Sequence, residues 1–345
     1  MVSDGVTSQR IQWIDAARGV AILLVVLHHA MQVASSSGYS SALWKEVSEA
    51  FATLRMPLFF TLSGLLAVNW MSKSWRELLT NKVATFVWLY LLWQAVTVSV
   101  RLLFPTGTLT GGTVVRQLVI AVSTPIIPQN SLWFLWALAI FFVLSRLIFQ
   151  LAPAWLVLSV SAVLSALVFS WTIYIKNPGW SGALENYVFF ALGLYGALLI
   201  RAFADRVTAI QALAVVAIWA AAVFLTDYRA LLLNVPIRLL GVAAGVAIGV
   251  LLARSRVLRA AGSRTLVFFL PHYIILGMLG LIVVQVDLGA NARMWLPVAL
   301  FAITLAAAVA LHALAHRLRA DWFYRLPDPI RRSLVRQPEP QANLN

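Results

Sequence analysis

Long apolar runs separated by short polar segments dominate the pattern of hydrophobic and polar positions along this chain. Each run is close to the ~20 residues that an α-helix needs to cross a hydrocarbon core of about 30 Å. Ten such runs occur, at about 18–35, 54–71, 83–104, 131–150, 154–173, 183–201, 207–226, 233–252, 265–286 and 295–316. The pattern predicts an all-α, polytopic membrane protein with about ten transmembrane helices, forming one domain over residues 1–317.

The segment between the third and fourth runs breaks this pattern. Prolines and glycines flank a short apolar stretch, Val114 to Val122, which is too short to cross a bilayer. We expect a helix on the periplasmic surface here.

The first run has an alternative interpretation as a cleavable signal peptide, because Arg10 and Arg18 precede a short apolar stretch that is followed by small residues. Two features argue against it. The apolar stretch ends in His28 and His29, and Asp15 lies in the supposed positive region. A removable signal has no use for either feature, so we interpret the run as the first transmembrane helix.

Composition supports a membrane protein and narrows the possible chemistry. Hydrophobic residues make up 61% of the chain and charged residues 11%, with a mean hydropathy of +0.87. So few charged residues cannot cover the surface of a soluble protein of this size, which excludes soluble enzymes, fibres and disordered chains. The chain has no cysteine, which excludes disulfides, thiolate nucleophiles, iron–sulfur clusters and cysteine-ligated zinc.

The net charge of +14 is better explained by membrane topology than by nucleic-acid binding, because the basic residues lie mostly in the short segments between apolar runs. With a cytoplasmic N-terminus, eighteen of the twenty-six Lys and Arg residues fall on the cytoplasmic side. The positive-inside rule therefore predicts that both termini are cytoplasmic, and an even number of spans agrees. Residues 318–345 are expected to form a flexible, basic cytoplasmic tail.

Ionisable residues inside a predicted span are costly to bury and are therefore candidates for function. His29 lies deep in the first span, and Arg18 precedes it by eleven residues, or about three helical turns, so the two side chains share one face. Asp15, three residues before Arg18, is placed for an ion pair that holds the guanidinium at the helix start. His28 points about 100° away from this face. In the alternative interpretation, Asp15 and Arg18 mark the membrane interface and His29 is a packed histidine bonded to a neighbouring helix.

Several segments around and beyond these residues match a known pattern. The first, IDAARG at 14–19, is followed by an apolar helix that ends in His29, so that ten residues separate Arg18 from His29. The others are RMPLFFTLSG at 55–64, SLWFL at 131–135, FFALG at 189–193 and FLPH at 269–272. In this order, across residues 10 to about 316, they resemble the acyltransferase 3 family of bacterial integral membrane O-acyltransferases.

The resemblance implies that the chain lies in a bacterial inner membrane and moves an acyl group from cytoplasmic acyl-coenzyme A to a hydroxyl of a glycan or glycolipid at the periplasmic face. It implies that His29 is catalytic and that Arg18 is its paired basic residue. An imidazole within reach of the acceptor hydroxyl acts as a general base, and a guanidinium suits the phosphates of the donor. About 16 Å of helix between the two residues would separate the ends of a pantetheine arm. Acylation of His29 itself stays open.

Four further residues are candidates for substrate binding, each with a structural alternative. Arg55 is expected at the periplasmic start of the second helix, where it orients the acceptor or the developing oxyanion, or else caps the helix or pairs with a nearby glutamate. Ser63 leaves room for the acyl chain or allows close helix packing. Trp133 offers a ring for sugar stacking or belongs to an interfacial belt. His272, after Pro271, belongs to the site or only satisfies the carbonyl freed by the proline.

Arg76 and Lys82 are further candidates for the donor phosphates, although they are sparser than the basic motif of the family. His312 and His316 have the spacing of a zinc pair but no evident third ligand. We therefore expect no metal and no permanently bound cofactor, with acyl-coenzyme A as co-substrate. The expected partners are donor, acceptor and lipid bilayer, and not nucleic acid. The sequence does not identify the acyl group, the acceptor or the oligomeric state.

A transporter or flippase for a glycoconjugate or an anionic metabolite is the alternative function, with Arg18 and His29 lining a route instead of catalysing a reaction. Transporters often contain inverted repeats with broken helices at the membrane midplane. The sequence shows no matching halves, which favours the enzyme.

Overall fold

The computed structural model describes residues 3–104, 113–289 and 291–335, and these residues form helices and connections without a strand. The elements of the first half are α1 (Ser3–Ser36), α2 (Ala42–Met71), α3 (Trp75–Leu78), the π-helix η1 (Leu79–Val83), α4 (Ala84–Leu103), α5 (Val114–Ser123), α6 (Trp133–Ile148) and α7 (Ala154–Phe169). Those of the second half are α8 (Pro178–Tyr195), α9 (Ala197–Arg206), α10 (Ala209–Leu225), α11 (Asn234–Leu251), α12 (Arg256–Ser263), α13 (Thr265–Phe269), α14 (His272–Val283), α15 (Ala292–Arg317), the 3-10 helix η2 (Asp321–Phe323) and α16 (Asp328–Val335).

Each of the ten predicted apolar runs coincides with helix in the structure, and the all-α class is confirmed for the described residues. Among the described residues, six helical segments are long and apolar enough to cross a membrane. The pair α8 and α9, bent by 73°, adds a seventh if it is a single span. The remaining predicted runs correspond to α6, α7 and α10, which have 16, 16 and 17 residues. Ten crossings and cytoplasmic termini therefore stay predictions. The short helix expected between the third and fourth spans is α5, and its apolar side chains are largely exposed.

Two helices begin well before the predicted spans. The first helix starts at Ser3, so Asp15 and Arg18 lie inside a helix and not at the helix start expected from the sequence. Similarly, α2 starts at Ala42, which places Arg55 and Pro57 in its interior and not in its first turn. The sequence estimate failed because polar residues that end an apolar run do not end a helix, whose backbone hydrogen bonds continue through them.

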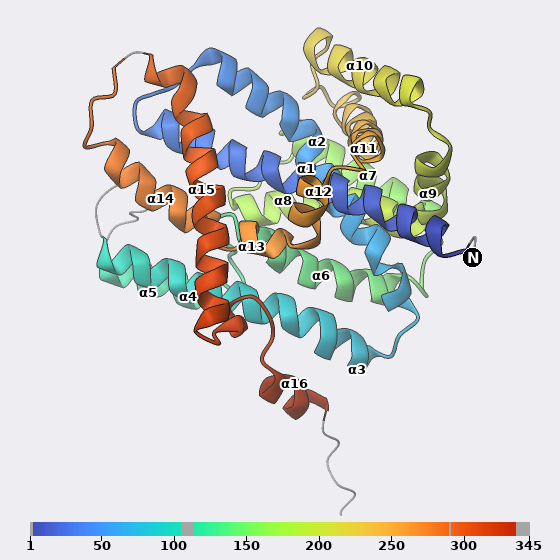
Figure 1. Cartoon of the computed structure of the whole chain (residues 1–345). Coiled ribbons are helices and arrows are strands. Elements are labelled where there is room, and N and C mark those ends of the chain that lie inside the picture. Colours follow the sequence, from blue (N-terminus) through green and yellow to red (C-terminus); the bar gives the residue numbers. More distant parts are fainter. Residues whose placement is uncertain (1–2, 105–112, 290, 336–345) are drawn as a thin grey trace, which may run out of the picture.

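The first helix lies at the centre of the bundle, where it contacts α2, α11, α12, α14 and α15 (Figure 1). Glycines allow the closest of these approaches. A Cβ atom at Gly19 would lie 2.1 Å from the carbonyl oxygen of Leu258, and one at Gly262 would lie 1.7 Å from that of Asp15. Because only glycine fits such a backbone contact, α12 is held directly against the half of α1 that carries Arg18.

The segment after α15 packs on α4 and η1. The indole nitrogens of Trp88 and Trp93 donate to the carbonyl oxygens of Trp322 and Phe323, at 2.9 and 2.7 Å. Arg331 donates to the side-chain oxygen of Asn81 at 2.7 Å. The part of the predicted tail up to residue 335 is therefore attached to the bundle, whereas residues 336–345 lie outside the described residues.

Candidate functional site

The two residues singled out on α1 both face the broken span formed by α13 and α14. The guanidinium of Arg18 donates to the hydroxyl of Thr265, which opens α13, at 3.0 Å. Eleven residues further along α1, the ring of His29 lies 5.1 Å from that of His272, which opens α14. Arg18 and His29 therefore lie on one side of α1, with a single neighbouring segment opposite both.

The hydrogen bond between His29 and Gln32 fits one tautomer of the neutral ring. Its Nδ1 lies 2.7 Å from the side-chain oxygen of Gln32. An amide oxygen can only accept, so Nδ1 carries the proton. The Nε2 atom of the neutral ring is then left with its lone pair and is the basic nitrogen.

His272 has the same arrangement in a fully buried position. Its side chain is completely inaccessible to solvent, and its Nδ1 donates to the carbonyl oxygen of Phe269 across the break at Pro271. Its Nε2 is a buried lone-pair nitrogen without a hydrogen-bond partner in the described part of the chain. His272 thus binds a carbonyl oxygen next to the kink, two residues beyond the one that Pro271 frees, and its ring also lies beside that of His29.

His28 belongs to the same group of rings, although its side chain leaves α1 in another direction. Its ring centre is 5.0 Å from that of His29, and its Nδ1 lies 2.6 Å from the hydroxyl of Ser48 on α2. Together with Gln32 and Ser48 it lines a cavity of about 610 Å³ where the end of α1 meets the start of α2. We call this space, whose walls include Ser35, Ser40 and Ser41, the serine-lined cavity.

Arg55 contributes a buried positive charge beside these rings. Its side chain is 8% exposed and donates to the carbonyl oxygen of Ser48 at 2.9 Å. It interacts electrostatically with both His28 and His29. The expected pairing with a nearby glutamate does not apply to Glu49, which accepts a hydrogen bond from Tyr228 at 3.0 Å.

Two predicted substrate residues are used for packing in the structure. The hydroxyl of Ser63 donates to the carbonyl oxygen of Phe59, one turn earlier in α2, at 2.8 Å. The ring of Trp133 lies 5.8 Å from that of Phe60, and it fills the space in which a Cβ atom at Gly182 would lie 2.7 Å from it.

Positive charge gathers around Arg18, near the middle of α1. Lys82, on the π-helix η1, interacts electrostatically with Arg18 and lies over the ring of Trp70 at 4.9 Å. Asp15 interacts electrostatically with Arg18 and Arg259, but none of the ion pairs between described residues joins Asp15 to Arg18. The hydroxyl of Thr265, and not the carboxylate of Asp15, holds the guanidinium. Arg76 lies on the exposed turn α3, before η1.

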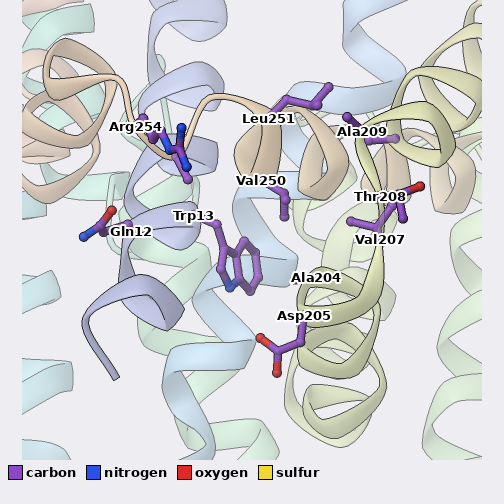
Figure 2. Close-up of a pocket in the computed structure, with 12 residues that line it drawn as sticks. Gln12, Trp13, Ala204, Asp205, Val207, Thr208, Ala209, Val250, Leu251 and Arg254 are labelled. Atoms are coloured by element: carbon purple, nitrogen blue, oxygen red, sulfur yellow. The ribbon is translucent and has the colours of Figure 1, made fainter. Parts of the chain in front are cut away.

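A second cavity, of about 620 Å³, opens beside the N-terminal half of α1, between this helix and α9, α10 and α11. Figure 2 shows Trp13 of α1 beside it, with Asp205 on α9 and Arg254 after α11 at its edges. Arg18 does not line it, because its side chain turns to Thr265.

Sequence reasoning missed Gln32, Ser48 and Thr265. Gln32 had a signal, since it follows His29 by three residues and so lies on the same side of α1. Ser48 and Thr265 had none, because only the packing of α2 and α13 on α1 brings them near. In the described part of the chain, no three His, Asp or Glu side chains are grouped closely enough to hold a metal ion.

Comparison with known proteins identifies one family. The family model described as an acyltransferase domain matches residues 11–313, which is nearly the whole chain. No match to a curated protein or to a solved structure was found.

Proposed function

Since the chain belongs to the acyltransferase 3 family of membrane acyltransferases, we propose that it transfers an acyl group from cytoplasmic acyl-coenzyme A to a hydroxyl of a sugar-containing acceptor at the periplasmic face. The observation that carries this proposal is the state of His29. Its Nδ1–H is bound by Gln32, so its Nε2 is free to accept a proton.

His29 is the general base of the proposed reaction. The acceptor hydroxyl attacks the thioester carbonyl while His29 Nε2 takes its proton, a role that typically contributes about 10²–10⁴-fold to a rate. The carbon–sulfur bond then breaks, and the proton passes to the departing thiolate of coenzyme A. His272, whose ring centre lies 5.1 Å from that of His29, holds the reacting groups in line or shares the proton.

Arg55 stabilises the oxyanion that forms when the hydroxyl adds to the carbonyl. A buried guanidinium that is already fixed, here by the carbonyl oxygen of Ser48, does not need to reorganise as negative charge develops. Its electrostatic interaction with both His28 and His29 supports this position.

Arg18 and Lys82 bind the phosphates of coenzyme A about three helical turns before His29. The two cations repel each other electrostatically, and phosphate is the ligand that relieves their repulsion. The eleven residues from Arg18 to His29 span ~16 Å of helix, a distance that an extended pantetheine arm covers.

Labelled acetyl-coenzyme A tests this proposal on protein in sealed vesicles. Envelope glycans and glycolipids from the producing cells are enclosed, donor is added outside, and mass spectrometry detects new esters. Wild type should form labelled ester inside, and His29→Ala should lower the rate at least about 100-fold. His312→Ala, on α15, is the matched control and should retain activity.

Three results would contradict the proposal. Wild-type activity in inserted His29→Ala protein would exclude the general base. Absence of any labelled ester would exclude acyl transfer to these acceptors. Unmodified solute that crosses the membrane without donor would indicate a transporter.

A further inference from the structure

The serine-lined cavity has the position and the size of a ligand site beside the proposed base. Two of its wall residues bind the histidines directly: Gln32 accepts from His29 at 2.7 Å, and Ser48 is 2.6 Å from Nδ1 of His28. Its volume of about 610 Å³ lies within the range of small-molecule sites, roughly 300–1,000 Å³. The side chain of Gln32 therefore lies between His29 and a molecule bound in this space.

Some hydroxyl groups of the cavity wall make no hydrogen bond with the described part of the chain. Ser41 is the N-cap of α2, yet its side chain makes no capping hydrogen bond. The hydroxyls of Ser35 and Ser40 also make no hydrogen bond with the described part of the chain. Groups that both donate and accept, and that are not used by the fold, suit a ligand with several hydroxyls of its own.

Two aromatic side chains of the wall are fixed in place. The indole nitrogen of Trp44 donates to the carbonyl oxygen of Met294 at 2.9 Å. The hydroxyl of Tyr39 donates to the carbonyl oxygen of Val286 at 3.1 Å and accepts from the backbone N–H of Leu288 at 2.8 Å. Because their polar ends are bound, the rings keep their orientation, and fixed rings bind flat ligand faces at a small entropic cost.

The charge of the wall favours a neutral ligand. Among the residues that line the cavity, the Lys, Arg, Asp and Glu side chains are those of Lys45 and Glu49, one of each sign. Glu49 is also engaged by Tyr228 at 3.0 Å and by Arg229 at 3.5 Å. A site for a phosphate or a lipid headgroup would instead show several cations without a counter-charge.

We propose that the serine-lined cavity binds the acceptor as a neutral, polyhydroxylated sugar unit, and that Gln32 is the positioning residue that links the occupied cavity to His29. This inference rests on the proposed function for the identity of the ligand as acceptor. Gln32 has one face towards the cavity and its oxygen on His29. It therefore keeps Nε2 unprotonated and aimed at the reaction while the sugar lies against its other atoms.

The natural absence of cysteine allows a binding test that does not require catalysis. Ser41→Cys introduces a single thiol in the wall at a position where the hydroxyl does not cap its helix. Ser123→Cys, at the end of α5 and outside the wall, is the matched control. The rate of alkylation by a neutral maleimide is measured by mass spectrometry, with and without the extracted envelope glycans and glycolipids, in wild-type and His29→Ala backgrounds.

The extract should slow alkylation of Ser41→Cys at least threefold in both backgrounds and leave Ser123→Cys unchanged. Absence of protection overturns the cavity assignment, even if the protein transfers acyl groups. Equal protection by envelope phospholipids freed of glycans overturns it in favour of a lipid site. Protection without ester formation upholds the cavity while the proposed function fails.

Kinetics of transfer to the same acceptors test the role of Gln32. Gln32→Leu should lower kcat at least tenfold with the KM for donor unchanged, because the proton on Nδ1 loses its acceptor. Gln32→Glu, which retains an oxygen there, should restore most of kcat. Equal loss in both variants, or a loss that follows only from reduced folded protein, overturns the positioning role.

Discussion

At the scale of single residues, the site consists of pairs in which a neighbouring residue fixes a functional side chain by a hydrogen bond. Thr265 holds the guanidinium of Arg18 at 3.0 Å, and Gln32 holds the Nδ1–H of His29 at 2.7 Å. The carbonyl oxygen of Ser48 holds Arg55. Each pairing reduces the rotamer freedom of a long or flat side chain. Less conformational entropy of that side chain is therefore lost when substrate binds. The proposed chemistry therefore depends on the supporting residues as well as on His29.

Donor affinity should depend on the charge of Arg18 more than on its anchor. We expect Arg18→Ala to raise the KM for acetyl-coenzyme A about tenfold or more, because a hydrogen bond to a charged group contributes about 1.5–3 kcal/mol. Arg18→Lys should cost about threefold, since the charge stays but the planar fork is lost. Thr265→Val, which removes only the anchor, should have an effect of about twofold. An unchanged KM in Arg18→Ala would move the donor site to Arg76 and Lys82.

At the scale of elements, close contacts between backbones position the site. Gly64 of α2 and Gly193 of α8 face each other. A Cβ atom at Gly64 would lie 2.0 Å from the carbonyl oxygen of Phe190, and one at Gly193 would lie 1.9 Å from that of Thr61. Helices in lipid gain little from burying apolar surface against each other, so such close packing is a main source of their association. The α2–α8 contact thereby fixes the helix that carries Arg55 and Ser48.

Gly64→Ala should destabilise this contact because the new methyl group meets a backbone carbonyl that cannot turn aside. Overpacking of this kind costs about 1–3 kcal/mol, and we expect a lower thermal unfolding midpoint in detergent. Ser63→Ala, the neighbouring control, removes only a bond within α2 and should change stability by about 0.5 kcal/mol or less. If Ser63→Ala instead raised the KM of a substrate at unchanged stability, Ser63 would belong to the binding site.

At the scale of the whole molecule, the bundle separates two chemical environments along α1. Near its middle lies Arg18, with Lys82 nearby, and beside its C-terminal part lie three imidazoles, a buried guanidinium and a cavity lined by hydroxyls. A donor with phosphates and a neutral acceptor would thus approach from opposite sides. The predicted topology, with both termini cytoplasmic, assigns the Arg18 side to the cytoplasm.

Single cysteines test this topology in the cysteine-free chain. A membrane-impermeant maleimide should label Ser123→Cys on α5 in intact cells, because that helix is predicted on the periplasmic side. Ser333→Cys on α16 should react only after the cells are permeabilised. Labelling of Ser333→Cys in intact cells would show that the C-terminus is outside and that the positive-inside assignment is wrong.

The sequence by itself determined the position of the apolar helices and the relation between Arg18 and His29. A helix forms through hydrogen bonds to residues four positions away, so its existence and the residues that share its face follow from local spacing. Length and hydropathy likewise located all ten apolar runs. The limits of α1 and α2 were missed because their polar ends are helical too.

Only the tertiary structure decided what those residues meet. Thr265 is 247 positions from Arg18, and His272 comes to His29 because α14 packs on α1 beyond the break at Pro271. Such contacts depend on the close approach of backbones at glycines and on the fit of side chains between helices, which no local pattern records. The same packing gave Ser63 and Trp133 contacts within the bundle and made His28, set aside by its direction on the helix, part of a cavity wall.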